Sequence, residues 1–427
     1  RSMRSLGAIL RVAWRHLTDR PRQTWLTVAG VALGVAVFVF TISMMDGLTV
    51  YFTQRLIRVS PLLTVLPERL DVAANREQLR RAYPADLVAL SRPPVPDDRE
   101  TVRAAVPLAR RLGALPWIDG ASVAAAVSAI LSYGTVVEPV TLLGVEPEEE
   151  ARVTSLPQQV RDGSWSGLVL RRDGVVLGYQ LAGRLGAAVG DRVVATGELG
   201  QRRELEVVGI AVTGLGAIDE SNAFVPLPVA QGLAGWSSAE GTEVRIRTKR
   251  ITGLESLRAE LQRTTGLKVE TWQEASSASL KLFRTISITT YLLTGFVLVV
   301  AGLGISNKLT TVILEKERDI AVLRSFGFSR AAIRGIFLLE GLLLGASGAL
   351  LGCAVAGCVI LWLTTFPIRF EPHEGGVMAY TELYLNNDPR YYLLIAVASL
   401  VIAALAALFA VRRAVRVAPV EVLRGSV

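Results

Sequence analysis

The stretch EKERDIAVLRSFGFSR, Glu315 to Arg330, lies between two long apolar segments of the chain. Its first five residues, Glu315 through Asp319, are all ionisable. An α-helix turns by about 100° per residue, so five such residues surround it and no rotation hides them from lipid. Because a Lys, Arg or Asp at the bilayer centre costs about 2.5–3.5 kcal/mol, we expect this stretch outside the hydrocarbon core.

Apolar residues with helical spacing run through the same region. They recur at intervals of three, four and seven residues, and they are Leu309, Val312, Ile313, Ile320 and Leu323. This periodicity predicts that the second apolar segment continues beyond the membrane as an amphipathic helix.

A turn and a second helix are predicted after the charged residues. Gly327 is a natural helix stop, and Ser329 is a suitable N-cap for the next helix, with Phe328 and Ile333 placed as a hydrophobic staple. Phe326 and Phe328 would lie near the tip of this elbow. A merely solvated loop is the alternative, but exposed aromatic residues at a structured turn favour docking to a protein partner.

Composition indicates a membrane protein with a sizeable extramembrane domain, since 51% of the 427 residues are hydrophobic and 20% are charged. Four segments approach or exceed the roughly 20 apolar residues that a spanning helix needs. They are Trp25–Met45, Ile286–Ile305, Ile336–Leu363 and Tyr391–Val411, and they leave residues 1–24, 46–285, 306–335, 364–390 and 412–427 outside the membrane. The third segment is longer than a bilayer requires, so it should tilt or project.

The distribution of Lys and Arg predicts the orientation. Basic residues gather before the first span, between the second and third, and after the fourth, whereas the short loop between the third and fourth has only Arg369 and Arg390. By the positive-inside rule both termini and residues 306–335 are cytoplasmic, and residues 46–285 lie outside. The same rule accounts for the net charge of +8 without invoking nucleic acid.

Residues 46–285 are expected to form a mixed α+β domain, in two lobes separated near SRPPVPDD, Ser91–Asp98. The predicted strands are Val140–Val145, Gly174–Gly178, Asp191–Thr196, Glu204–Ile210 and Glu243–Thr248, with GELGQ as a hairpin turn. The predicted helices are Tyr179–Gly186, Pro228–Gly235 and Gly253–Thr264. The acidic cluster EPEEE, Glu146–Glu150, is expected to be a solvated loop rather than a metal site.

Catalytic and metal-binding chemistry finds little support in the sequence. The two cysteines, Cys353 and Cys358, share one apolar segment, and the only histidines are His16 and His373. A disulfide framework, a metal site or imidazole catalysis is therefore not expected. The chain also lacks a G-x-x-x-x-G-K-[ST] motif, so if ATP drives this protein, another polypeptide must bind it.

Small residues and one carboxylate stand out within the spans. Glycines spaced four apart place small residues on one helix face for close packing, either within one subunit or in a dimer interface, and these pairs are Gly30/Gly34, Gly341/Gly345 and Gly348/Gly352. Glu340 lies in the apolar run FLLEGLLLG, where a charge costs at least about 2.5 kcal/mol. We favour pairing of Glu340 with a basic residue near the cytoplasmic interface over a proton or substrate site.

The stretch EKERDIAVLRSFGFSRAAIRGIFLLEG resembles the signature region of FtsX/MacB-like ABC transporter permeases. The segment GVALGVAVFVFTISMMDGL, Gly30–Leu48, is similar to the first span of the lipoprotein-releasing LolC and LolE branch. GYQLAGRLGAAVGDRVVA and VVGIAVTGLGAIDESNAFVPLPVAQGL look like the periplasmic domain of that family, and RRAVRVAPVEVLRG looks like its cytoplasmic tail. The resemblance covers nearly the whole chain.

The resemblance implies a four-span permease of the bacterial inner membrane that works as a homo- or heterodimer with two separate ATPase subunits. ATP and Mg would be bound by those ATPases, and long helices would transmit their movement to periplasmic domains that extract or expel an amphiphile. The family's coupling helix corresponds here to Glu315, Lys316, Glu317, Arg318, Asp319, Ile320, Leu323, Arg324, Phe326, Gly327 and Ser329. Asp319 replaces the more usual Glu.

The resemblance leaves three functions open. The first is extraction of lipoproteins or another amphiphile from the membrane, with a periplasmic chaperone as a further partner. The second is efflux of a small amphiphile through a periplasmic adaptor. The third is an FtsX-like signalling permease that activates a cell-wall hydrolase, although its usual outer domain is much smaller than residues 46–285.

Overall fold

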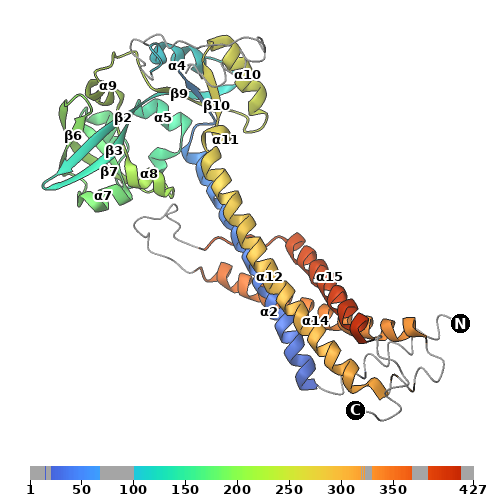
Figure 1. Ribbon diagram of the computed structural model, residues 1–427. Coiled ribbons are helices and arrows are strands. Elements are labelled where there is room, and N and C mark those ends of the chain that lie inside the picture. Colours follow the sequence, from blue (N-terminus) through green and yellow to red (C-terminus); the bar gives the residue numbers. More distant parts are fainter. Residues whose placement is uncertain are drawn as a thin grey trace, which may run out of the picture. The chain divides into compact units, whose positions relative to one another are not determined.

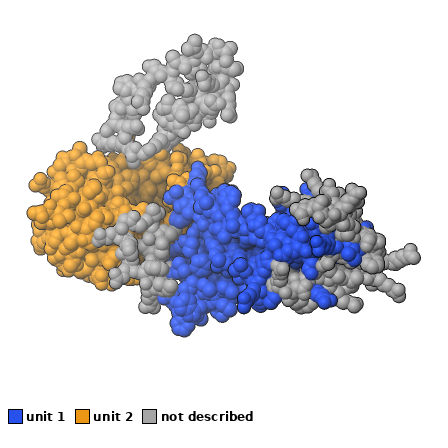
Figure 2. Space-filling view, turned by 60° about the horizontal axis from the view of Figure 1, so that its bottom comes forward, with its two compact units in different colours: residues 1–51, 281–369, 382–427 blue, residues 52–280, 370–381 orange. Residues whose placement is uncertain are grey.

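The computed structural model describes residues 15, 21–67, 101–318, 320, 322, 329–367 and 383–414. The chain forms two compact units, which Figure 2 colours separately. We call residues 1–51, 281–369 and 382–427 the helical unit, and residues 52–280 and 370–381 the sheet unit.

Four long helices contain the apolar segments and are labelled in Figure 1. They are α2 (Pro21–Val59), α12 (Ser277–Glu315), α14 (Arg330–Thr365) and α15 (Pro389–Ala414). Each is long and apolar enough to cross a membrane, which confirms the four predicted spans. The helices α2 and α12 have 39 residues each, so each is about 58 Å long against a hydrocarbon core of about 30 Å.

Glycines let α14 approach two neighbouring helices closely. A Cβ atom added at Gly341 or Gly345 would lie under 3.0 Å from the side chain of Ala407 or Ala403 on α15. A Cβ added at Gly348 or Gly352 would likewise lie under 3.0 Å from atoms of α2. Gly341 and Gly345 therefore allow α14 to pack closely against α15, and Gly348 and Gly352 allow it to pack closely against α2.

The Gly30/Gly34 pair on α2 behaves differently. Gly34 is buried, and a Cβ there would lie 3.3 Å from the Cβ of Ala301 on α12. Gly30 is exposed, and a Cβ added to it would meet no atom within 4 Å. Packing within one subunit thus involves Gly34 and not Gly30.

The sheet unit is built on one mixed sheet of ten strands. The strands are β1 (Leu63–Leu66), β2 (Ile118–Tyr133), β3 (Val136–Val145), β4 (Val160–Gly163), β5 (Gly174–Gly178), β6 (Arg192–Gly197), β7 (Arg202–Ala211), β8 (Asn222–Pro226), β9 (Glu243–Thr248) and β10 (Lys268–Thr271). Their order is β10-β1-β9-β2-β3-β8-β5-β7-β4, and β6 pairs with both β2 and β7. The pairs β3/β8 and β5/β7 are parallel, whereas the other pairs are antiparallel.

Short helices pack around this sheet. They are α4 (Ala105–Gly113), α5 (Pro147–Val153), α6 (Gly167–Leu170), α7 (Tyr179–Leu185), α8 (Gly216–Ser221), α9 (Leu227–Ala234), α10 (Leu254–Thr265) and α11 (Trp272–Ala275), with a 3-10 turn at Leu156–Gln159. The five predicted strands and three predicted helices are confirmed, as is the β6–β7 hairpin, where Gly197 N–H donates to the Gln201 carbonyl at 2.9 Å. All described strands join one sheet, and Ser91–Asp98, where the boundary between two lobes was expected, lies outside the described residues, so the division into lobes stays a prediction.

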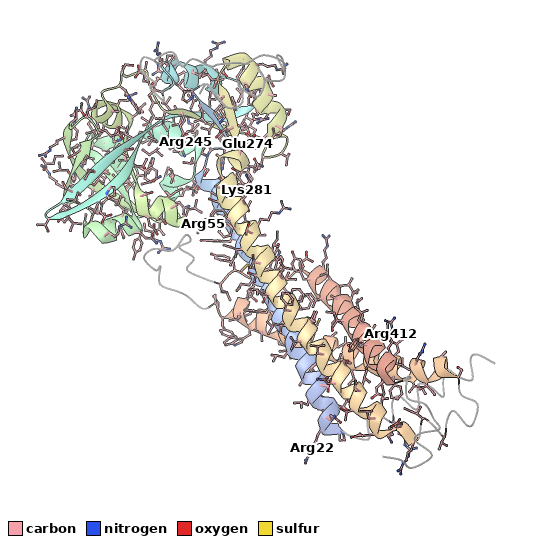
Figure 3. The ribbon with its side chains drawn as sticks, in the orientation of Figure 1. Arg22, Arg55, Arg245, Glu274, Lys281 and Arg412 are labelled. Atoms are coloured by element: carbon pink, nitrogen blue, oxygen red, sulfur yellow. The ribbon has the colours of Figure 1, made fainter. Side chains whose placement is uncertain are left out.

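The acidic cluster Glu146–Glu150 is not a solvated loop. Its residues from Pro147 onward form the first turn of α5, and Glu150 is fully buried. The Oε1 atom of Glu150 lies 2.6 Å from Nη1 of Arg245 on β9 and also accepts a hydrogen bond of 2.9 Å from Thr154 Oγ1. Figure 3 labels Arg245 within the sheet unit. The prediction was wrong because a buried cation from a distant strand compensates the cost of burying Glu150.

Glu243 is a second carboxylate beside Arg245, whose Nε atom lies 3.4 Å from Glu243 Oε1. Burial raises the pKa of Glu243 above its ordinary value of 4.5; Arg245 opposes this shift, and the carboxylates of Glu150 and Glu270 add to it. A raised pKa means that the folded chain holds this proton more tightly than the unfolded chain. Ionisation of Glu243 therefore removes stability as the pH rises through its folded-state pKa.

The first prediction concerns the glycines of α14. Gly345→Ala should destabilise the chain by about 1–3 kcal/mol, because the new methyl group overpacks the contact with Ala403. The matched change Gly335→Ala lies on the same helix where no atom would meet the new Cβ within 4 Å, and it should stabilise by up to about 1 kcal/mol through helix propensity. Thermal unfolding of the full chain in detergent measures both. Equal effects of the two substitutions would contradict the close approach of α14 to α15.

The second prediction concerns Glu243. Glu243→Gln cannot ionise, so its stability relative to the wild type should be higher at pH 7 than at pH 4. Hydrogen exchange of β9 in the full chain at both pH values gives the comparison. Glu148→Gln, which removes an exposed carboxylate from α5, is the matched control. A pH-independent effect of Glu243→Gln would contradict the proposed cost of its charge.

Candidate coupling region at one end of the helical unit

Four helix ends meet at one end of the helical unit. The Lys308 Nζ atom of α12 donates a 2.8 Å hydrogen bond to Thr24 Oγ1, near the start of α2. A buried apolar cluster joins the end of α12, the start of α14 and the end of α15, and it consists of Val312, Ile313, Ile333, Phe337 and Val411. The helices thus alternate in direction, and the charged stretch follows directly from this cluster.

The charged residues continue the helical path of α12. Lys316 N–H donates to the Val312 carbonyl at 3.0 Å, and Ile320 N–H donates to the Lys316 carbonyl at 2.9 Å. Ile320 packs against the apolar cluster, whereas Glu315 and Arg318 are exposed and Lys316 and Glu317 are half-buried. This arrangement has an apolar side toward the bundle and charges on the rest of its surface.

Ser329 begins the next helix. Its Oγ atom accepts a 3.2 Å hydrogen bond from the Ala332 N–H, which confirms Ser329 as the N-cap of α14. The remaining predicted coupling residues lie outside the described residues: Asp319, Leu323, Arg324, Phe326 and Gly327.

Glu340 is fully buried in α14 and interacts electrostatically with Lys308 of α12, whose side chain is also buried. Because Lys308 also donates to Thr24, this one amine connects three helices near the end of the bundle. A buried charge is costly to move away from its counter-charge, so this interaction opposes separation of α12 from α14. The structure thus brings one basic residue, Lys308, near enough to Glu340 for an electrostatic interaction, and a structural role for Glu340 stays a prediction.

At the opposite end of the helices, a set of contacts surrounds Asp46 of α2. The Asn386 Nδ2 atom and the Tyr391 hydroxyl both hydrogen-bond to its carboxylate. The sequence did not predict this cluster, because Asp46 only follows the first apolar segment and Asn386 only lies in the short loop between the third and fourth segments. In the part of the chain that the structure describes, no group of three or more His, Cys, Asp and Glu side chains is placed to hold a metal ion.

Comparison with known proteins places this architecture in a family. Residues 24–264 match the MacB-like periplasmic core domain, and residues 291–419 match the FtsX-like permease C-terminal region. The first match spans more than half of the chain.

Relatives align over nearly the full length. The lipoprotein-releasing system transmembrane protein LolC of Xylella fastidiosa is 25% identical, with 97% of this chain and 98% of the relative aligned. LolE of Haemophilus influenzae is also 25% identical, with 96% and 98% aligned. The macrolide export ATP-binding/permease protein MacB of a Shewanella species is 23% identical over 81% of this chain and 52% of that protein. The chain therefore belongs to the FtsX/MacB-like family of ABC transporter permeases.

Proposed function

We propose that this chain is the permease subunit of an ATP-driven transporter that releases lipoproteins, or another amphiphile with a lipid anchor, from the outer face of a bacterial inner membrane. The near-full-length match to relatives named as lipoprotein-releasing proteins carries this proposal. ATP and Mg would be bound by a separate ATPase pair, and the permease would act beside a second copy or a second permease subunit.

The mode of action that we propose is mechanical transmission. The helices α2 and α12 are each about 58 Å long, so they exceed the hydrocarbon core of a bilayer by about 28 Å, and a continuous helix is a stiff element. Both contain residues of the helical unit and of the sheet unit. Movement imposed on the end with Lys316 and Arg318 would pass along these helices to the sheet unit.

The orientation that we propose follows from charge. The bundle end with the charged stretch also carries Arg22 at the start of α2 and Arg412 near the end of α15, both labelled in Figure 3. By the positive-inside rule this end is cytoplasmic, so the termini are cytoplasmic and the sheet unit is periplasmic. Efflux of a small amphiphile with a periplasmic adaptor is the second candidate, favoured by the match to MacB over 81% of this chain.

The release prediction can be tested in a reconstituted membrane. The chain, purified with its ATPase partner and placed in vesicles that contain native lipoproteins, should liberate lipoprotein when ATP is added and not when a non-hydrolysable analogue is added. Mass spectrometry of the soluble fraction identifies the product. Recovery of a small amphiphile alone would favour efflux, and ATP hydrolysis that no amphiphile alters would contradict both transport functions.

The coupling prediction concerns the charged stretch. The double reversal Lys316→Glu/Arg318→Glu should weaken ATPase association by about tenfold or more, because it reverses two charges of the proposed docking surface. The control Arg161→Glu/Arg202→Glu changes the net charge equally at exposed positions of the sheet unit and should bind the ATPase normally. Co-purification of the ATPase with each variant gives the comparison. Unchanged association of the Lys316/Arg318 variant would remove this stretch from the ATPase interface.

A further inference from the structure

A short segment that precedes α15, Leu383–Asp388, is bound tightly to α2 within the helical unit. Asn386 N–H donates to the Ser43 carbonyl at 3.0 Å, and Ser43 Oγ donates to the Asn386 carbonyl at 2.7 Å. Gly47 permits this approach, because a Cβ there would lie within 3.0 Å of the backbone of Tyr384 and Asn386. A non-helical segment beside spanning helices must find partners for its backbone groups, and α2 supplies them here.

Side chains reinforce the same contact. The rings of Tyr51 on α2 and Tyr384 stack with their centroids 3.9 Å apart. The Asp46 carboxylate accepts hydrogen bonds from Asn386 Nδ2 and from the Tyr391 hydroxyl of α15, and it interacts electrostatically with Tyr291 of α12. Hydrogen bonds to a carboxylate are about twice as strong as neutral ones, so this is the firmest point of the contact. We call Ser43, Asp46, Gly47, Tyr51, Tyr384, Asn386 and Tyr391 the clasp.

The clasp lies where α2 leaves the helical unit. Tyr51 is the last residue of α2 in that unit, and Phe52 is the first in the sheet unit. Within the sheet unit the end of α2 is also fastened: Arg55 donates to Gln159 Oε1 at 2.9 Å, and Arg247 Nη1 donates to the Ile57 carbonyl at 2.7 Å. Contacts within the helical unit thus hold α2 up to Tyr51, and contacts within the sheet unit hold it at Arg55 and Ile57.

We propose that Asp46 is a positioning residue for transmission: the clasp makes α2 and the start of α15 move as one body, so that movement of α15 is added to that of α2 and reaches the part of α2 in the sheet unit. This rests on the proposed function. With the clasp open, α2 could slide or rotate against α15, and ATP-driven movement of α15 would no longer reach α2. The bonds of the clasp would then serve coupling in addition to folding.

A reversed hydrogen bond tests the clasp. Asn386→Asp places two carboxylates together and removes the donor to Asp46, whereas Asp46→Asn/Asn386→Asp restores one donor and one carboxylate in exchanged positions. Thr49→Ala is the control, since Thr49 is exposed on the same helix and its hydroxyl bonds only to the Met45 carbonyl. Each full-length variant is assembled with the ATPase in lipid nanodiscs, and hydrogen exchange of residues 52–59 is measured with and without ATP.

We expect ATP to change the exchange rates of residues 52–59 in the wild type and in Thr49→Ala. Asn386→Asp should lose the part of this response that depends on α15, while ATP hydrolysis continues. The double variant should recover most of the response. ATPase turnover and the amount of assembled complex are measured in the same samples. A response that changes while both of these stay constant indicates a coupling role and not a purely structural one.

Three results would overturn the inference: a normal response in Asn386→Asp, a response that falls only in proportion to the assembled complex, or a wild type without any response to ATP. The readout does not depend on the cargo. A complex that shows the expected exchange pattern but releases no lipoprotein would therefore contradict the proposed function and leave the clasp in place.

Discussion

Close backbone contact between α14 and its neighbours holds the helical unit together. In lipid, helices gain little from burying apolar side chains against one another, because lipid tails are equally apolar. Cohesion must then come from dense packing, which Gly345 allows against α15 and Gly352 allows against α2. Because α14 is in contact with both, it sets the distance of each from the common core, and the polar contacts at the two ends of the bundle depend on that spacing.

The polar contacts at the two ends of the bundle oppose sliding of the helices, which apolar packing alone does not prevent. Helices that are apolar on most sides can slide past one another at small cost, since many registers bury similar side chains. A buried charge has few acceptable positions, because a shift that separates it from its partner costs several kcal/mol, on the order of 3–5. Lys308, which donates to Thr24 and interacts with Glu340, and Asp46, which accepts from Asn386 and Tyr391, therefore favour one register of the helices that they join.

The sequence was sufficient to predict a strand or helix where the local residue pattern and the tertiary environment favour the same structure. The strands β5 and β9 were predicted to the residue, because β-branched runs stand between clear boundaries. The long strand β2 was missed, because alanine has a low strand propensity and β2 contains a run of alanines. The tertiary environment favours the strand, since α4, α5 and α9 pack against it and its small side chains leave room for these helices. The partners of Glu150 and Glu340 were also missed, because each lies on a distant element that only the fold brings near.

The position of the charged stretch now has a physical reason. The apolar core of the bundle ends at the cluster around Ile313, Ile333 and Val411, and Ile320 is the last described apolar side chain that packs on it. Beyond that point a charged helix is soluble but still fastened to the bundle by its apolar side. On the proposed function, a charged helix packed against α14 and α15 would pass an applied force to both, whereas an unpacked helix would bend. Docking at Glu315–Arg318, on the proposed function, would act on the same helices whose far ends the Asp46 contacts hold.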